Sequence, residues 1–283
     1  MTVMNSVPDP AGFDPVHKAH AIEQVMFVLR FEGEADGSAL AEASKTLIGD
    51  PGLPGKNEII MGLSIQLGMA LPPPLTMRRP TPHGYNHFHT RPDGLVDIEL
   101  TVDRSSLVFR TLNYDRWAAN WEQAKKYIAK FLPAYTQTAK LAAIGLNYSD
   151  KFVWKGAPET CDAAYVLRKG SDYVSPRIFT APDLWHSHSG AFGKEDGDTK
   201  RLTTVNLDML DEPTPEGNRR ALAITSVLTD MFNQPGYEPL RLAPDNTLAF
   251  IDQRMQELHA LNKNILGSIL TENMVKRIAL FGG

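Results

Sequence analysis

The 283-residue sequence contains one cysteine, Cys161, which excludes an internal disulfide and any metal site built from four thiols. This favours a reducing compartment, so we expect a cytoplasmic protein. An excess of positive charge is also lacking, because 29 Lys and Arg residues stand against 33 Asp and Glu residues, with a formal net charge of -4. Proteins that bind nucleic acid through its phosphates usually carry a basic excess. Nucleic acid is therefore a disfavoured partner.

Long apolar runs are missing too. A membrane-spanning helix needs roughly 20 consecutive apolar residues, and the nearest approach, residues 59–71, is interrupted by Ser64 and Gln66 and followed by three prolines. The N-terminal segment contains prolines and acids where an export signal needs a basic start and an apolar segment. We expect a soluble protein with no membrane partner and no export signal.

Recognisable catalytic motifs are absent from the sequence. It contains no G-x-S-x-G elbow, no phosphate-binding P-loop, no G-x-G-x-x-G after a predicted strand and no H-E-x-x-H pair of metal ligands. The sequence leaves open whether the protein is an enzyme, and our interpretation leans towards a protein without catalysis.

The clearest pattern that is present predicts a β-hairpin followed by an amphipathic helix. Apolar and polar residues alternate over 96–102, as in a strand with one buried face, and a turn of short polar residues leads into a return strand. From Trp117 onward apolar residues recur on one helical face, which also carries Trp121. We expect this helix to pack on the antiparallel strands before it and to end at Pro133.

Other periodic segments extend this pattern over the whole chain. Strands are predicted at 25–31, 59–71, 85–90, 141–148, 184–192, 202–209 and 219–229, and helices at 38–49, at 158–168, from 246 onward and at 272–280. Each half then has the order strand, helix, several antiparallel strands, long helix.

This order predicts an α+β fold of two tandem units, each a curved antiparallel sheet packed by a long helix. The arrangement resembles TATA-binding-protein-like and helix-grip folds, and the two units could share one sheet. The expected boundaries are an N-terminal arm at 1–20, a first unit at 21–135 and a second unit at 136–283.

Four segments together resemble one protein family. They are the opening strand HAIEQVMFVLRFE (20–32), Tyr114 three residues before Trp117 at a helix start, the strand AAIGLNYSDKF (142–152) and the helix segment ELHALNKNIL (257–266). The sequence resembles a sporadically distributed bacterial family of uncharacterised proteins of about this size.

This resemblance concerns the fold and implies no activity, cofactor or site residue. Residues 147–149 depart from it, because Asn-Tyr-Ser stands where an arginine-containing run is more usual. A sporadic distribution would suit a gene carried by mobile elements or phage.

Histidines form the most unusual cluster. Five of the eight fall in two predicted strands, PHGYNHFHT and LWHSHSG. Residues two apart in a strand point the same way, so His87 with His89, and His186 with His188, could each present two imidazoles to a metal. If the two halves face each other, the four rings could converge on one zinc or iron. The favoured alternative is four strand histidines that face solvent or bond locally, so no cofactor is expected.

Three arginines near the first histidine strand are candidates for ligand binding. Arg78, Arg79 and Arg91 could bind an anion or a phosphate backbone, although solvated loop arginines are the commoner case. Small residues at 62, 64, 68 and 70 alternate with the apolar residues of the 59–71 strand, where they could admit another backbone or a ligand.

For two further residues, a chemical role and a purely structural role are both candidates. Cys161 lies near a predicted helix start, which could lower its thiol pKa, and His259 in the last long helix could act as a base. Both are better explained as ordinary helix residues.

Three functions from different classes follow. The first is a non-catalytic scaffold that binds a protein partner, in the setting of phage–host conflict. The second is a ligand-binding protein or metal-dependent enzyme with a cavity between the sheet and a long helix. The third is nucleic-acid binding through Arg78, Arg79, Arg91, Arg219 and Arg220. The sequence favours the first.

Overall fold

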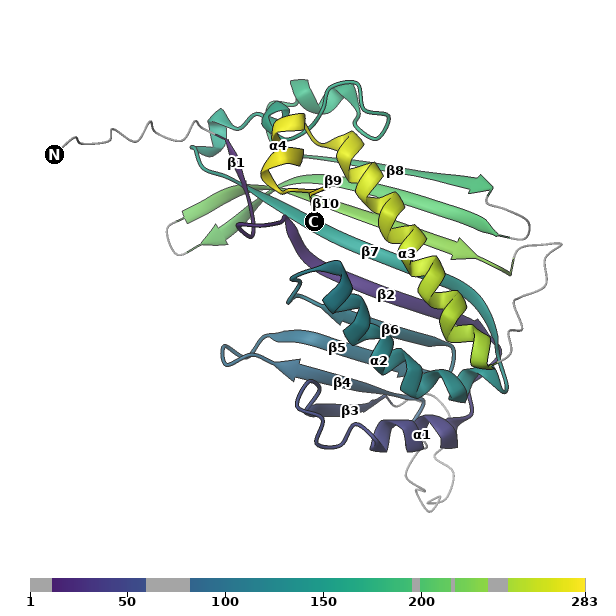
Figure 1. Cartoon of the computed structure of the whole chain (residues 1–283). Coiled ribbons are helices and arrows are strands. Elements are labelled where there is room, and N and C mark those ends of the chain that lie inside the picture. Colours follow the sequence, from purple (N-terminus) through teal and green to yellow (C-terminus); the bar gives the residue numbers. More distant parts are fainter. Residues whose placement is uncertain (1–11, 60–81, 195–198, 215–216, 234–243, 283) are drawn as a thin grey trace, which may run out of the picture.

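The computed structural model describes residues 12–59, 82–194, 199–214, 217–233 and 244–282. Within these ranges ten strands form one sheet, every strand pair is antiparallel, and the long helices lie against one face of it (Figure 1). This confirms the predicted α+β class with an antiparallel sheet. Among the helices of the described ranges, none is long and apolar enough to cross a membrane.

The strand order places the first strand of each half at the centre. The order is β3-β4-β5-β6-β2-β7-β10-β9-β8, and β1 pairs with β7 outside this path. The strands are β1 (Phe13–Pro15), β2 (Ile22–Glu32), β3 (Gly55–Ile59), β4 (Gly84–Thr90), β5 (Val96–Asp103), β6 (Ser106–Thr111), β7 (Lys140–Trp154), β8 (Trp185–Lys194), β9 (Lys200–Thr214) and β10 (Gly217–Met231). β2 and β7 therefore meet in the middle, and the remaining strands of each half extend outward.

The two faces of the sheet differ in burial. On the helix-covered face, Phe27 of β2, Phe109 of β6 and Leu146 of β7 are fully buried. On the opposite face, Asn147 and Ser149 of β7 are only half-buried. This is the alternation expected of an antiparallel sheet with one face packed and one face in water.

Two long helices cover the packed face. The helices are α1 (Gly37–Lys45), α2 (Trp117–Thr136), α3 (Pro244–Ile269) and α4 (Glu272–Arg277). The Trp121 ring is buried 5.3 Å from Phe27, and its Nε1 donates to Asp252 Oδ1 at 2.5 Å. Trp117 Nε1 donates to Gln256 Oε1 at 2.7 Å. The tryptophans thus pack α2 on the sheet as predicted, and they also link it to α3.

The prediction that Pro133 ends this helix is wrong, because α2 continues through it to Thr136. Proline removes one backbone donor and crowds the preceding turn, but tertiary contacts hold the last turn in place. Tyr135 is fully buried, and its hydroxyl lies 2.5 Å from the carbonyl oxygen of Asp103 and 2.7 Å from that of Ser106, to which it donates.

The helix predicted at 158–168 is also wrong. The structure has two single-turn 3-10 segments instead, Pro158–Thr160 and Ala163–Tyr165. The Asp162 carboxylate accepts from the backbone N–H of Ala164, so it starts a new turn where a helix would continue. Arg168 Nε then donates to the carbonyl oxygen of Leu270, just beyond α3.

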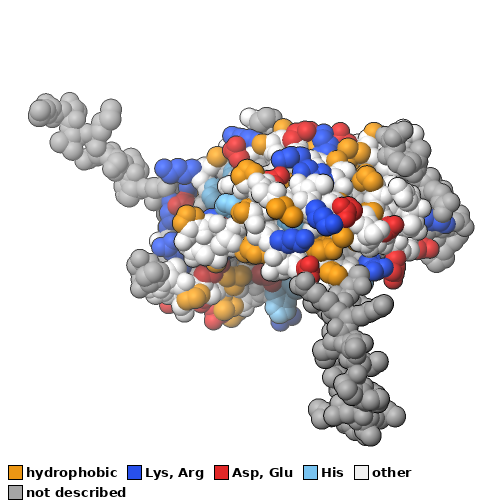
Figure 2. All heavy atoms as spheres, turned by 90° about the horizontal axis from the view of Figure 1, so that it is seen from below, with side chains coloured by type: hydrophobic (Ala, Val, Ile, Leu, Met, Phe, Trp, Pro, Cys, Tyr) orange, Lys and Arg blue, Asp and Glu red, His pale blue; other side chains and the backbone are white. Residues whose placement is uncertain are grey.

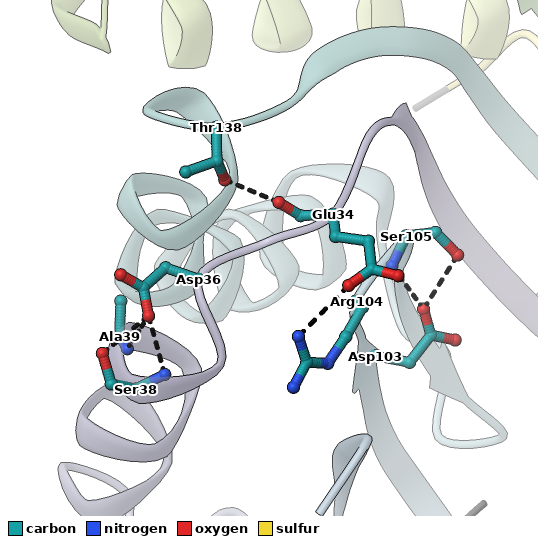
Figure 3. A network of polar contacts seen from close by, with 8 residues as sticks. All are labelled: Glu34, Asp36, Ser38, Ala39, Asp103, Arg104, Ser105 and Thr138. Atoms are coloured by element: carbon teal, nitrogen blue, oxygen red, sulfur yellow. Dashed lines mark hydrogen bonds and ion pairs between the residues drawn. The ribbon is translucent and has the colours of Figure 1, made fainter.

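A polar network fixes the loop between β2 and α1 (Figure 3). The Asp36 carboxylate accepts from the backbone N–H groups of Ser38 and Ala39 and caps α1. The carbonyl oxygen of Glu34 accepts from Thr138 Oγ1 at 2.7 Å, and the Glu34 carboxylate pairs with Arg104. The network joins the end of α2 to the β5–β6 turn.

Some predictions fall outside the described residues or are not tested by the strand order. β3 covers only the first residue of the strand predicted at 59–71, and the remainder, with the small residues at 62, 64, 68 and 70, lies outside the described ranges. The boundary at 135/136 stays a prediction, since both halves belong to one sheet.

Basic and acidic side chains are interspersed on the face shown in Figure 2.

Candidate functional site

A cavity lies between the centre of the sheet and the C-terminal part of α3. Its volume is about 500 Å³, within the range usual for small-molecule sites. Five segments form its walls: the chain entering β2 (residues 19–22), the start of α2 (114–118), the β7 residues Tyr148 and Asp150, the α3 residues His259, Asn262, Lys263 and Leu266, and the chain after α4 (278–280).

Asp150 is the deepest charged group of this cavity. In β7 it shares the helix-covered side of the sheet with Tyr148 and Phe152, and it pairs across the sheet with two apolar residues, Ile22 of β2 and Ile224 of β10. The residue is 1% exposed, and neither carboxylate oxygen accepts a hydrogen bond from any described residue. Burial raises the pKa of Asp150 to about 7.

A hydrogen-bonded aromatic chain lies beside Asp150. The Tyr148 hydroxyl is 2.9 Å from His259 Nδ1, and the tautomer of the imidazole sets which of the two donates. The Tyr114 ring meets the Tyr148 ring edge-on, with centroids 6.2 Å apart. The His259 ring stacks on Trp117, with centroids 4.0 Å apart and planes 2° from parallel. These contacts fix the orientation of four rings that line one side of the cavity.

The ionisation states of these aromatic side chains follow from burial. Burial, and then the charge of Lys263, lowers the pKa of His259 to about 4, so the imidazole is neutral at pH 7. Burial raises the pKa of Tyr114 to about 12 and raises that of Tyr148 well above its ordinary value. Both phenols therefore keep their protons near neutral pH, and the negative charge of the cavity interior resides on Asp150.

Two more buried atoms in the wall have no hydrogen-bond partner within the described ranges, Asn262 Oδ1 and His20 Nδ1. Burial and the neighbouring His17 lower the pKa of His20. Charged groups of the wall lie farther out: Arg116 is exposed, and Lys263 Nζ lies 5.7 Å above the Phe281 ring. The interior thus presents an amide oxygen and an imidazole nitrogen in addition to the Asp150 carboxylate, and the rim carries the cations.

The first predicted histidine pair lies near one edge of the sheet. His87 of β4 is buried, its Nε2 is 2.9 Å from Ser44 Oγ, and burial lowers its pKa to about 4. His89 Nδ1 is 2.6 Å from Asp97 Oδ1. Both imidazoles therefore have local partners, as the plainer interpretation expected.

The second pair lies on β8, at the opposite edge. The rings of His186 and His188 are 5.4 Å apart, and His188 Nε2 is 3.3 Å from Asp208 Oδ1. Because β5, β6, β2, β7, β10 and β9 separate β4 from β8, the pairs lie seven strand spacings apart, roughly 34 Å along the sheet at about 4.8 Å per spacing. They do not meet at one metal, and the described chain holds no group of three or more His, Cys, Asp or Glu side chains placed for one.

The candidate arginines do not form one site among the described residues. Arg91 is exposed and pairs with Asp93 in the β4–β5 turn, whereas Arg78 and Arg79 lie outside the described ranges. Arg220 is mostly buried and pairs with Asp211 and Asp183, which neutralise it. This leaves Arg220 poorly suited to bind phosphate.

Cys161 does not have the environment of a reactive thiolate. It follows a 3-10 turn, and burial raises its pKa to about 11, which is opposite to the lowered value that a helix start would give. Cys161 is therefore not the helix residue that the sequence predicted, and burial opposes the formation of a thiolate there.

The segments that carried the family resemblance all reach the cavity. His20 comes from the opening strand segment, Tyr114 and Trp117 from the helix start, Tyr148 and Asp150 from the middle strand and His259 from the C-terminal helix. No model of a known protein family matches the chain, and no curated protein matches its sequence. The family therefore stays a prediction.

Sequence reasoning did not single out Asp150, Tyr148 or His20 as site residues. A signal existed in the strand register: Leu146, Tyr148, Asp150, Phe152 and Trp154 alternate along β7, so Asp150 is a carboxylate on an otherwise aromatic and aliphatic face. The predicted strand ended at Tyr148, two residues too early to show this.

Proposed function

We propose that this protein binds a small organic molecule in the cavity between β7 and α3, with Asp150 as the polar anchor. The observation that carries the proposal is the buried carboxylate of Asp150, whose two oxygens accept no hydrogen bond from the described residues. A buried charge without a partner is costly to the folded state, and such costs are typical of binding and catalytic sites.

The rest of the cavity wall supports the same function. Rings of Tyr114, Tyr148, Trp117 and His259 are held by one hydrogen bond, one stacked contact and one edge contact, so they form a rigid, mainly apolar surface around the anchor. A rigid wall loses little conformational entropy when a ligand binds. The cavity is thus pre-formed, as ligand sites usually are.

The other predicted functions have less support. A scaffold for a protein partner, and its link to phage or mobile elements, stay predictions. On the open face of the sheet, Lys151 already pairs with Glu23 and Glu212, so these three charges are not free to recognise a partner. We also propose that the two halves are tandem units of TATA-binding-protein-like type, which the central pairing of β2 with β7 supports.

A fragment screen by ligand-observed NMR tests the ligand-binding function. Ala19 is exposed at the rim of the cavity, so Ala19→Trp should obstruct the entrance without changing the core. Ala249→Trp, at an exposed position of α3 away from the cavity, is the matched control. We expect fragments that bind the unchanged protein and Ala249→Trp but not Ala19→Trp. If no fragment distinguishes the two variants, the function is wrong.

A further inference from the structure

Most of the buried cavity atoms without a hydrogen-bond partner in the described ranges are acceptors, and His20 Nδ1 accepts or donates according to its tautomer. When Asp150 is ionised, its two oxygens can only accept hydrogen bonds, and the same holds at all times for Asn262 Oδ1. None of these three atoms accepts a hydrogen bond from the residues of the described ranges. The Tyr148 hydroxyl is engaged with His259 Nδ1. A ligand that satisfies these atoms must therefore bring donors.

The charge of the cavity interior favours a cation over a neutral donor. His259 and His20 are neutral at pH 7, since their pKa values are lowered, so the ionised Asp150 is not compensated by either imidazole. The rim cations are directed elsewhere or exposed: Lys263 Nζ lies over the Phe281 ring, and Arg116 faces solvent. Aromatic faces close to the carboxylate add a second attraction for a positive charge.

We infer that the ligand is an organic cation with an apolar body, an amine or amidinium whose positive group bonds the Asp150 carboxylate and whose body lies against the Trp117 and Tyr148 rings. This inference rests on the proposed function. The two parts of such a ligand match the two parts of the cavity, an acceptor-lined floor and walls made by residues such as Leu266, Ile278 and Leu280.

The cation can bind its partner only when Asp150 is ionised, so binding must release a proton below pH 7. The titratable and charged groups that line the cavity around Asp150 are His20 from the chain entering β2, Tyr114, Asp115 and Arg116 from the start of α2, Tyr148 from β7, and His259 and Lys263 from α3. From β10, the neighbour across the sheet is the apolar Ile224. Of the two histidines, His259 has a pKa of about 4 and so stays neutral from pH 6 to 8.

Three planar probes of nearly equal shape test this inference: benzamidine, benzamide and benzoate, which carry positive, zero and negative charge. Their dissociation constants are measured by calorimetry or NMR titration on the full chain at pH 8. We expect benzamidine to bind about tenfold to a hundredfold more tightly than benzamide, as a charge-assisted hydrogen bond would give, and benzoate to bind most weakly. Below pH 7 the benzamidine affinity should fall about tenfold per pH unit.

Two substitutions test the role of the Asp150 carboxylate separately from the role of the cavity. Asp150→Asn keeps the side-chain shape and should abolish the preference for benzamidine over benzamide, whereas Asp172→Asn, the same change at an exposed position, should keep it. If benzamide or benzoate binds as tightly as benzamidine, or if Asp150→Asn keeps the preference, the inference of a cationic ligand is wrong, while the proposed ligand-binding cavity is unaffected. The same conclusion follows if benzamidine does not bind although other fragments do. Failure of the cavity itself would show in the fragment screen with Ala19→Trp.

Discussion

The buried carboxylate of Asp150 makes a quantitative prediction about the stability of the protein without added ligand. The pKa of Asp150 is raised from its ordinary 3.8 to about 7 in the folded state. Between these values the folded chain holds a proton that the unfolded chain has lost, so the free energy of unfolding falls as the pH rises. Above pH 7 both states are ionised and the loss is complete.

The size of this effect follows from the two pKa values. Each unit of difference corresponds to about 1.4 kcal/mol, and between pH 5 and pH 8 the contribution of Asp150 falls by about 3 kcal/mol. Asp150→Asn cannot titrate but keeps the shape of the side chain. We therefore expect the stability advantage of Asp150→Asn over the unchanged protein to grow by about 3 kcal/mol between these two pH values.

Urea unfolding at pH 5 and pH 8, followed by tryptophan fluorescence, measures this difference. Other titrating groups are present in both proteins, so their contributions cancel when the two free energies are subtracted. Asp172→Asn, exposed and outside the cavity wall, should show no pH-dependent advantage. An advantage of Asp150→Asn that is equal at both pH values would refute the burial argument and remove the anchor from the proposed site.

Three further predictions concern parts of the fold around the site. Asp230→Ala breaks the buried ion pair with Arg201, in which Arg201 Nε lies 2.6 Å from Asp230 Oδ1. We expect it to lower the free energy of unfolding in urea by about 3–5 kcal/mol. The control Asp183→Ala removes an exposed partner of Arg220 and should lower it by less than about 1 kcal/mol. Tyr135→Phe removes the hydroxyl that donates to the carbonyls of Asp103 and Ser106, and should destabilise by about 1–3 kcal/mol, whereas Tyr165→Phe at a half-exposed site should not. Dialysis of untagged protein against a chelator should leave its melting temperature unchanged, because the two histidine pairs lie on β4 and β8 at opposite ends of the sheet; a lower melting temperature that zinc restores would contradict this.

The elements were predictable where local pattern and burial agree. The alternation of apolar residues at 96–102 and the tryptophan face of α2 reflect the side that each element buries, and both were confirmed. The end of α2 was mispredicted because distant carbonyls decide it, and the segment at 158–168 because the Asp162 carboxylate starts a new turn and a distant carbonyl binds Arg168. The Tyr135 hydroxyl holds the end of α2, and the carbonyl of Leu270 binds Arg168.

The candidate site was not predictable in the same way. Its walls come from five segments, and only the pairing of β2 with β7 and the crossing of α3 bring His20, Asp150 and His259 together. No local pattern encodes that pairing. The histidine pairs, which do stand out locally, are separated by the strand order that the sequence leaves open.

The two ends of the described chain meet at the cavity. β1 pairs with β7, Arg277 at the end of α4 donates to the carbonyl of Phe13 at 2.9 Å, and residues 19–22 and 278–280 stand in the same wall. Contacts between distant parts of a sequence form slowly, because closing the long loop between them loses chain entropy first. Binding of a probe would thus show that the segments at 19–22 and 278–280 have packed together. Deletion of either segment should abolish binding while the sheet still forms.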